Sequence, residues 1–318
     1  MLRTLLLVIV VTSCSTDNDE VLNNTIQSES TSGGETMLVS FTLEQPVMQT
    51  RAFSDGLTAT TLTYAVYKAG DRNCLLKSED EVTFTDRVAT VDIRLEKEQN
   101  YDILFWADAP DTDYYTFDEN TQTITMNYGQ YRFENAQEDR DAFYGAEKNL
   151  YVDPSEATGG VINKTVTLTR PFAQLNIGAT DYSEELSMRS YCSYFQYLYS
   201  NLNLYTEEVS GEAKIIYAVG FTKITEPFPV TAEGADIKYL AMYYLPASTE
   251  ESSVYIGFYM LNDVNDYNTP AMISFITDVP LRRNYRTNLY GPLFSNVLPG
   301  DSSGVPNAPD VTILFEPE

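Results

Sequence analysis

The sequence predicts an all-β protein made of two consecutive β-sandwich domains. Aromatic residues, which suit a pleated and half-buried surface, are plentiful, with 24 tyrosines and 15 phenylalanines among 318 residues. Short runs of alternating apolar and polar residues follow one another at the spacing expected of a sandwich. No long stretch shows the 3.6-residue periodicity of an amphipathic helix. We place the boundary between the two domains near residue 180.

The charge and composition of the chain exclude several classes of function. The formal net charge is −26, so the surface repels phosphate backbones, and we expect no nucleic-acid partner. Histidine is absent, which removes the usual general base and the commonest metal ligand. There is also no glycine-rich phosphate loop, CxxC pair or nucleophile elbow. We therefore expect no enzyme activity, no catalytic residue, no metal and no cofactor, although the 46 Asp and Glu residues leave carboxylate chemistry open.

The first 14 residues, "MLRTLLLVIVVTSC", have the pattern of an export signal. One arginine precedes an apolar run from Leu5 to Val11, which is far shorter than the roughly 20 residues that cross a membrane as a helix. The ending "VTSC" resembles a bacterial lipobox, in which the cysteine becomes the lipidated first residue, so we expect lipidation at Cys14. The alternative is a disordered N-terminus without this role.

Residues 15–36 are expected to form an acidic, flexible tether. The segment is polar and free of aromatic side chains, so it cannot bury enough apolar surface to fold. Its acidic start resembles the surface-export signal of Bacteroidetes lipoproteins.

The N-terminal domain is expected over residues 37–180, with its first strand over 37–48. In that strand one face carries Met37, Val39, Phe41 and Leu43, the other face is polar, and Pro46 ends regular pairing. Further strands are predicted for "TLTYAVYK" (61–68), "EVTFTD" (81–86), "VATVDIRLE" (88–96), "YDILFWAD" (101–108) and "NKTVTLTRPFAQLNIG" (163–178).

The C-terminal domain is expected over residues 181–318. It opens with a segment (183–200) that we interpret as a short helix or an irregular loop. Strands are predicted for "NLNLYTEE" (201–208), "AKIIYAVGF" (213–221), "KYLAMYYLPAS" (238–248), "SVYIGFYML" (253–261) and "AMISFITDVPLRRNYRTNLYG" (271–291). The final strand, "VTILFEPE" (311–318), places Val311, Ile313 and Phe315 on one face.

Several side-chain groups are candidate binding sites, each with a simpler alternative. Two aspartate clusters have the oxygen ligands that calcium prefers, but neither matches the EF-hand loop pattern, and solvated loop charges are the favoured explanation: Asp108, Asp111, Asp113 and Asp118, then Asp263 and Asp266. An aromatic group is a candidate for stacking on sugars or for filling a core: Tyr191, Tyr194, Phe195, Tyr197 and Tyr199. The pairs Arg282/Arg283 and Asn284/Arg286 suit an anion or an exposed strand face. Cys74 and Cys192 are either a disulfide or two free thiols.

Arg51 is isolated in the sequence. It is the only basic residue between Arg3 and Lys68, and it lies between a predicted strand and the turn signal "SDG" (54–56). An isolated arginine in an exposed linker is an accessible and unambiguous cut site for a protease. The alternative is a solvated linker arginine without this role.

Four features occur in order along the chain: the lipobox cysteine Cys14, "TRAFSDG" (50–56), "LTRPFAQLNIG" (168–178) and "VPLRRNYRTNLYG" (279–291). Together they resemble the fimbrillin superfamily of Bacteroidales, the type V pilins and their related surface proteins. The resemblance spans the chain from the lipobox to the last strand. It implies two transthyretin-like β-sandwich domains and export as a lipoprotein to the outer membrane and cell surface.

For assembly, the resemblance implies donor-strand exchange triggered by proteolysis. An arginine-specific protease would cut between Arg51 and Ala52. The first strand, with Met37, Val39, Phe41 and Leu43, would then leave its groove. The C-terminal strand of a neighbouring subunit, with Val311, Ile313 and Phe315, would fill that groove.

The function that follows from the resemblance is that of a pilin in a surface fimbria that supports adhesion. The expected partners are other fimbrial subunits, the arginine-specific protease and, before cleavage, the outer membrane through the lipid anchor. The alternative is a non-polymerising surface lipoprotein or a tip adhesin that binds glycan or host protein.

Overall fold

The structure is a computed structural model, and it describes residues 34–46, 56–110, 112–128, 140–181, 190–212, 216–223, 237–261, 270–293 and 312–317. In these ranges the regular secondary structure consists of β-strands and short 3-10 turns such as η2 (Pro154–Glu156). The all-β prediction is therefore confirmed. No helix in the described ranges is long and apolar enough to cross a membrane.

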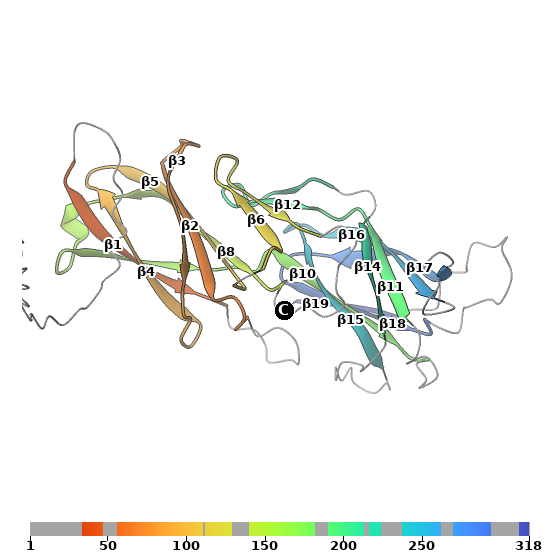
Figure 1. Ribbon diagram of the computed structural model, residues 1–318. Coiled ribbons are helices and arrows are strands. Elements are labelled where there is room, and N and C mark those ends of the chain that lie inside the picture. Colours follow the sequence, from red (N-terminus) through yellow and green to blue (C-terminus); the bar gives the residue numbers. More distant parts are fainter. Residues whose placement is uncertain are drawn as a thin grey trace, which may run out of the picture.

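The N-terminal half contains two sheets that face each other (Figure 1). The smaller sheet has the order β4 (Val88–Glu96), β1 (Thr36–Glu44), β9 (Val161–Thr167). The larger sheet has the order β3 (Cys74–Glu81), β2 (Thr61–Lys68), β5 (Asn100–Asp108), β8 (Phe143–Tyr151). The buried side chains between the two sheets form the N-terminal core.

The C-terminal half repeats this plan around a second core. One sheet has the order β15 (Lys238–Pro246), β10 (Phe172–Ala179), β18 (Tyr285–Gly291), β19 (Thr312–Pro317). The other has the order β14 (Ile216–Lys223), β11 (Ser190–Gln196), β16 (Ser252–Leu261), β17 (Pro270–Leu281). The segment 183–200, interpreted as a helix or loop, therefore contains a strand, because β11 is held between β14 and β16.

A fifth sheet joins the two halves. It has the order β13 (Val209–Ser210), β12 (Asn201–Asn203), β7 (Thr123–Met126), β6 (Tyr115–Asp118). In it, β12 of the C-terminal half pairs antiparallel with β7 of the N-terminal half, near the middle of the molecule in Figure 1. A third buried cluster lies at this joint and takes side chains from β2, β5, β10 and β15. No pattern in the sequence predicted this connection.

Continuous apolar runs in the sequence correspond to strands that are buried on both faces. In β5, Ile103 and Phe105 point into the N-terminal core, while Leu104 and Trp106 point into the cluster at the joint. A strand with two buried faces needs apolar residues at every position, which explains why this run does not alternate.

The predicted boundary at residue 180 does not agree with the strand pairing. From the sequence, we assigned the whole stretch 163–178 to the N-terminal domain. The second half of this stretch is in β10, which pairs antiparallel with β15 and parallel with β18, both strands of the C-terminal half. The stretch changes sheets between Thr167 and Phe172, at the sequence "LTRP", so Phe172–Ala179 lies with the C-terminal half. The division into two separate domains stays a prediction.

Candidate functional site

The first strand, β1, is the middle strand of its sheet. It pairs antiparallel with β4, from Thr36 opposite Glu96 to Glu44 opposite Val88, and parallel with β9, from Leu38 opposite Val161 to Glu44 opposite Thr167. Strands in a sheet lie about 4.8 Å apart, so removal of β1 would leave a groove about 9.6 Å wide between β4 and β9. That groove has the width for one strand.

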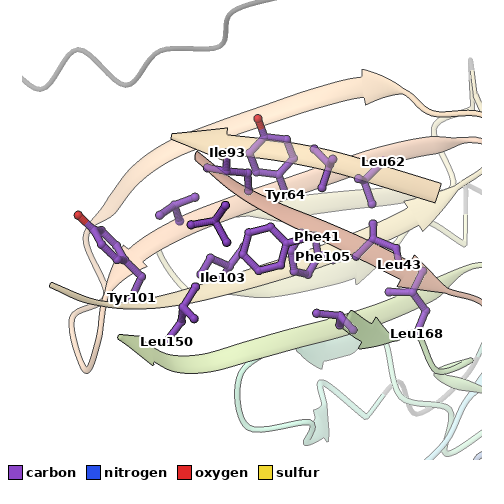
Figure 2. Close-up of a cluster of buried hydrophobic side chains, with 14 of the residues drawn as sticks. Phe41, Leu43, Leu62, Tyr64, Ile93, Tyr101, Ile103, Phe105, Leu150 and Leu168 are labelled. Carbon is purple, nitrogen blue, oxygen red and sulfur yellow. The ribbon is translucent and has the colours of Figure 1, made fainter. Parts of the chain in front are cut away.

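One face of β1 fills the N-terminal core. Val39, Phe41 and Leu43 are fully buried, and the ring of Phe41 lies 5.3 Å from that of Phe105 (Figure 2). The predicted alternation of β1 is therefore confirmed, but Met37 is only partly buried and lies at the margin of the core. Burial of three such side chains contributes roughly 4.5–9 kcal/mol gross, at about 1.5–3 kcal/mol each, as an upper bound.

The C-terminal end of β1 is held by backbone and side-chain contacts. The Gln45 N–H donates to the Arg87 carbonyl at 2.9 Å, and the Leu168 N–H donates to the Glu44 carbonyl at 2.7 Å. Arg87 lies in a tight turn with positive φ, and its Nη1 donates to the Pro46 carbonyl at 3.4 Å. The side chain of Gln45 is 5% exposed, and within the described structure neither of its amide atoms has a hydrogen-bond partner.

The predicted cleavage position lies outside the described residues. The description stops at Pro46 and resumes at Gly56, so Arg51 and Ala52 are not covered. Gly56 belongs to the predicted turn signal, and its φ of 76° favours glycine. A Cβ at this position would lie 2.8 Å from the Phe143 ring, so a larger residue would also clash. Cys14 likewise lies outside the description.

The last strand, β19, is an edge strand of the C-terminal half. Among the described strands it pairs with β18 alone, antiparallel, from Thr312 opposite Tyr290 to Pro317 opposite Tyr285. Ile313 packs against the C-terminal core, and Phe315 stacks on Tyr285 with ring centroids 4.8 Å apart. Leu314 points the other way and is 43% exposed. The predicted alternation is confirmed for Ile313 and Phe315, whereas Val311 lies outside the described residues.

The other candidate groups do not form sites in the described ranges. No group of three or more metal-ligating side chains occurs there, and Asp111, Asp263 and Asp266 lie outside them. Asp118 instead caps its own turn, because it accepts hydrogen bonds from Asn120 N and Thr121 Oγ1. Burial raises the pKa of Asp108 to about 6, and its Oδ2 accepts a hydrogen bond from Trp106 Nε1.

The aromatic group of residues 191–199, which begins in β11, divides between core and surface. Phe195 is fully buried and makes an edge contact with Tyr243, whereas Tyr197 is 51% exposed. The side chains of Tyr191 and Tyr194 are not described. The Cys74 thiol is free, and burial raises its pKa.

The motif arginines hold the two halves together. Arg170 is almost fully buried and forms a bidentate ion pair with Asp141, with two N–O distances of 2.7 Å. Arg283 is also buried; it donates to the Ala247 carbonyl at 3.1 Å, the Tyr144 hydroxyl at 2.6 Å and the Glu207 carbonyl at 2.9 Å. The interpretation of Arg283 as an anion ligand or as part of an exposed strand face was therefore wrong.

Buried amides connect the same two motifs. Asn176 of β10 lies directly opposite Asn288 of β18, and its Nδ2 donates to Asn288 Oδ1 at 2.8 Å. Gln174 Nε2 in turn donates to Asn176 Oδ1 at 3.1 Å. Because buried amides need hydrogen-bond partners, the amide side chains in "FAQLNIG" and "RTNLYG" satisfy one another's hydrogen bonds.

Comparison with known proteins identifies a family and a fold. A model of the family described as "Family of unknown function (DUF6562)" matches residues 30–313. The search of curated proteins found no match.

Among solved structures, a candidate cell adhesion protein from Parabacteroides distasonis has a TM-score of 0.52 at 10% identity, covering 88% of this chain and 96% of that chain. The fimbrial anchor protein Mfa2 from Porphyromonas gingivalis has a TM-score of 0.49 at 10% identity, covering 80% and 90%. The tip fimbrial protein Mfa3 from the same organism, with a C-terminal truncation, has a TM-score of 0.47 at 9% identity, covering 89% and 100%. The first of these matches confirms the expected resemblance at the level of the fold.

Proposed function

We propose that this chain, which belongs to the DUF6562 family, is a structural subunit of a cell-surface fimbria that supports adhesion. In this proposal the chain is exported as a lipoprotein through Cys14 and is cut between Arg51 and Ala52. Strand β1 then leaves, and β19 of a neighbouring subunit takes its place. Its partners are other fimbrial subunits, the arginine-specific protease and, before cleavage, the outer membrane.

The observation that carries the proposal is the position of β1. A middle strand whose inward face fills a core leaves behind an apolar groove with two unpaired edges when it departs. Such edges recruit a strand from outside, because backbone N–H and C=O groups need partners. Head-to-tail donation of this kind does not close on itself and therefore produces a filament.

The last strand fits the role of donor. Ile313 and Phe315 form an apolar stripe with the same two-residue period as the stripe of Val39, Phe41 and Leu43. Because β19 has one partner among the described strands and lies at the edge of its sheet, it can leave without opening the middle of that sheet. A structural role without catalysis also fits a sequence that lacks histidine.

The docked state of β19 favours a second candidate function. In the structure β19 pairs with β18 of its own chain. A subunit that keeps this pairing and retains β1 is a non-polymerising surface lipoprotein or a tip adhesin that binds glycan or host protein.

The test is to treat the purified chain, residues 15–318, with an arginine-specific protease. N-terminal sequencing and a non-boiled gel then show where the chain is cut and whether it forms oligomers. The proposal expects one new N-terminus at Ala52 and a ladder of oligomers. Arg51→Ala should remove both, while Arg72→Ala, at an exposed turn, should change neither. A chain that resists the cut at Arg51, or that is cut and remains monomeric, supports the second candidate instead.

A further inference from the structure

The rim of the β1 groove carries a distinct order of side chains. On the outward face, Leu38 lies opposite Arg94 of β4 and Val161 of β9. Ser40 lies opposite Asp92 and Asn163, and Thr42 lies opposite Thr90 and Thr165. Directly opposed residues share one face of a sheet, so a strand that replaces β1 meets a cation, an anion and two threonines in succession.

Arg94 is the unusual member of this rim. In the described part of the chain its guanidinium group forms no ion pair and no hydrogen bond, although the protein has 46 acidic residues for 20 basic ones. Its cross-strand neighbours in the same row, Leu38 and Val161, are apolar. The other cation at this sheet, Lys164 of β9, is paired with Glu156 at 2.9 Å.

Two placements of a donor strand fill the groove completely. The three fully buried positions of β1 are Val39, Phe41 and Leu43, and the donor offers three apolar residues at the same period, Val311, Ile313 and Phe315. When the three apolar residues of the donor take the three buried positions of β1, Ile313 takes the place of Phe41 whether the donor runs parallel or antiparallel to β1. Phe315 then takes the place of Leu43 if the donor runs in the direction of β1, or of Val39 if it runs in the opposite direction.

Both placements bring a carboxylate to Arg94. The apolar stripe of the donor is flanked by Asp310 and Glu316 in the sequence "DVTILFE". In the direction of β1, Asp310 takes the place of Leu38; in the opposite direction, Glu316 does. The placements shifted by two residues are all less favourable. With a donor antiparallel to β1, either shift places Glu316 beside Asp92 or Glu96. With a parallel donor, one shift places Pro317, which has no N–H, inside the ladder, and the other places Asp310 beside Asp92 and Pro309 at the place of Val39.

We propose that Arg94 is a specificity-determining residue, which fixes the register of the incoming strand by pairing with a carboxylate at the end of the apolar stripe. The occupant is residues 310–316 of a second copy of this chain. The inference rests on the proposed function. Opposite charges directly across a sheet stabilise pairing and like charges oppose it, so Arg94 selects donors that carry an acidic residue at this position.

The test uses full-length variants, cut with an arginine-specific protease and compared by their ladders on non-boiled gels at low salt. Arg94→Glu should lower the yield of oligomers about five-fold. Arg72→Glu, an equal change of charge at an exposed turn, should not. Adding Glu316→Lys or Asp310→Lys to Arg94→Glu should restore the ladder, and lysine creates no new site for this protease. Restoration by Glu316→Lys shows a donor antiparallel to β1, and restoration by Asp310→Lys shows a donor parallel to β1.

Two results would contradict the inference, and they are distinguishable. A wild-type chain that is cut but forms no ladder overturns the proposed function and this inference with it. A wild-type ladder that Arg94→Glu leaves unchanged, or that neither lysine variant restores, overturns the inference alone. Thermal unfolding of each uncut variant shows whether the fold is retained.

Discussion

At the scale of single residues, Gln45 departs from the rule that buried polar groups are hydrogen-bonded. Both of its amide atoms are buried at the end of β1 without a partner in the described structure. An unpaired buried group costs about 1–3 kcal/mol. Under the proposed function, this cost makes β1 easier to displace.

We expect Gln45→Met, which keeps the length of the side chain and removes the polar atoms, to raise the free energy of unfolding by about 1–3 kcal/mol. Urea denaturation of the uncut chain measures this change. Gln99→Met, at an exposed position, is the control. A free energy that stays the same or falls would show that the Gln45 amide is hydrogen-bonded in solution.

Asp108 gives a prediction on the dependence of stability on pH. Burial raises its pKa to about 6. The hydrogen bond from Trp106 lowers the pKa, but this effect is smaller than that of burial. In the unfolded chain the pKa is about 3.9, so between about pH 4 and pH 6 the folded state binds the proton and the unfolded state does not. The contribution of Asp108 to stability is therefore greatest at low pH and is lost as the pH rises through about 6.

Asp108→Asn should accordingly raise the free energy of unfolding at pH 7 and change it little at pH 4, because its amide oxygen can still accept from Trp106. Denaturation at the two pH values measures the difference, with Asp92→Asn at an exposed position as control. Equal effects of Asp108→Asn at both values would mean that the carboxylate is better hydrated than its burial indicates.

At the scale of elements, β1 and β19 differ in what their removal does to the subunit. Phe41 lies in the middle of a core, whereas β19 is an edge strand with a half-buried stripe. We expect Phe41→Ala to cost about 3–5 kcal/mol of stability.

Deletion of residues 312–318 should leave the chain folded and cut at Arg51, yet unable to form a ladder. Circular dichroism melting and non-boiled gels separate the two effects, and a truncated chain that still formed ladders would remove the donor role from β19.

The same elements show what a sequence can predict. The alternation in β1 and in β19 follows from one buried and one exposed face, so it was readable from neighbouring residues. The sheet to which β10 belongs could not be predicted from local sequence, because its partners β15 and β18 lie far along the chain. The strand β11 was missed for the same reason: its aromatic residues do not alternate, and pairing with β14 and β16 overrides the local pattern.

Single residues of the candidate site were harder still to predict. Arg94 stands out only when its row in the sheet is known, and Gln45 only when the burial of its amide is known. Arg283 bonds to Tyr144, which lies 139 residues away, so no local signal marks it as buried.

At the scale of the whole molecule, the two halves share one buried cluster, and this has a mechanical consequence. Under the proposed function, a fibre subunit transmits force between the β1 groove of the N-terminal half and the donor strand β19 of the C-terminal half. The joint resists this force through the pairing of β7 with β12 and through the buried contacts of Arg170 and Arg283. Trp106, the only tryptophan in the chain, lies within this cluster and contacts Tyr115 at 5.1 Å between ring centroids.

The ion pair between Arg170 and Asp141 provides the last prediction. Arg170→Met leaves the Asp141 carboxylate buried without its cation, and breaking a buried pair in this way costs about 3–5 kcal/mol. Adding Asp141→Leu removes that charge and should recover most of the loss, since apolar replacements of buried pairs are often neutral. Arg282→Met, whose side chain stacks on Tyr285 outside the joint, is the control. Denaturation followed by Trp106 fluorescence reports the joint directly, and a cost for Arg170→Met no larger than that of the control would show that the two halves are held by the strand pairing and apolar packing alone.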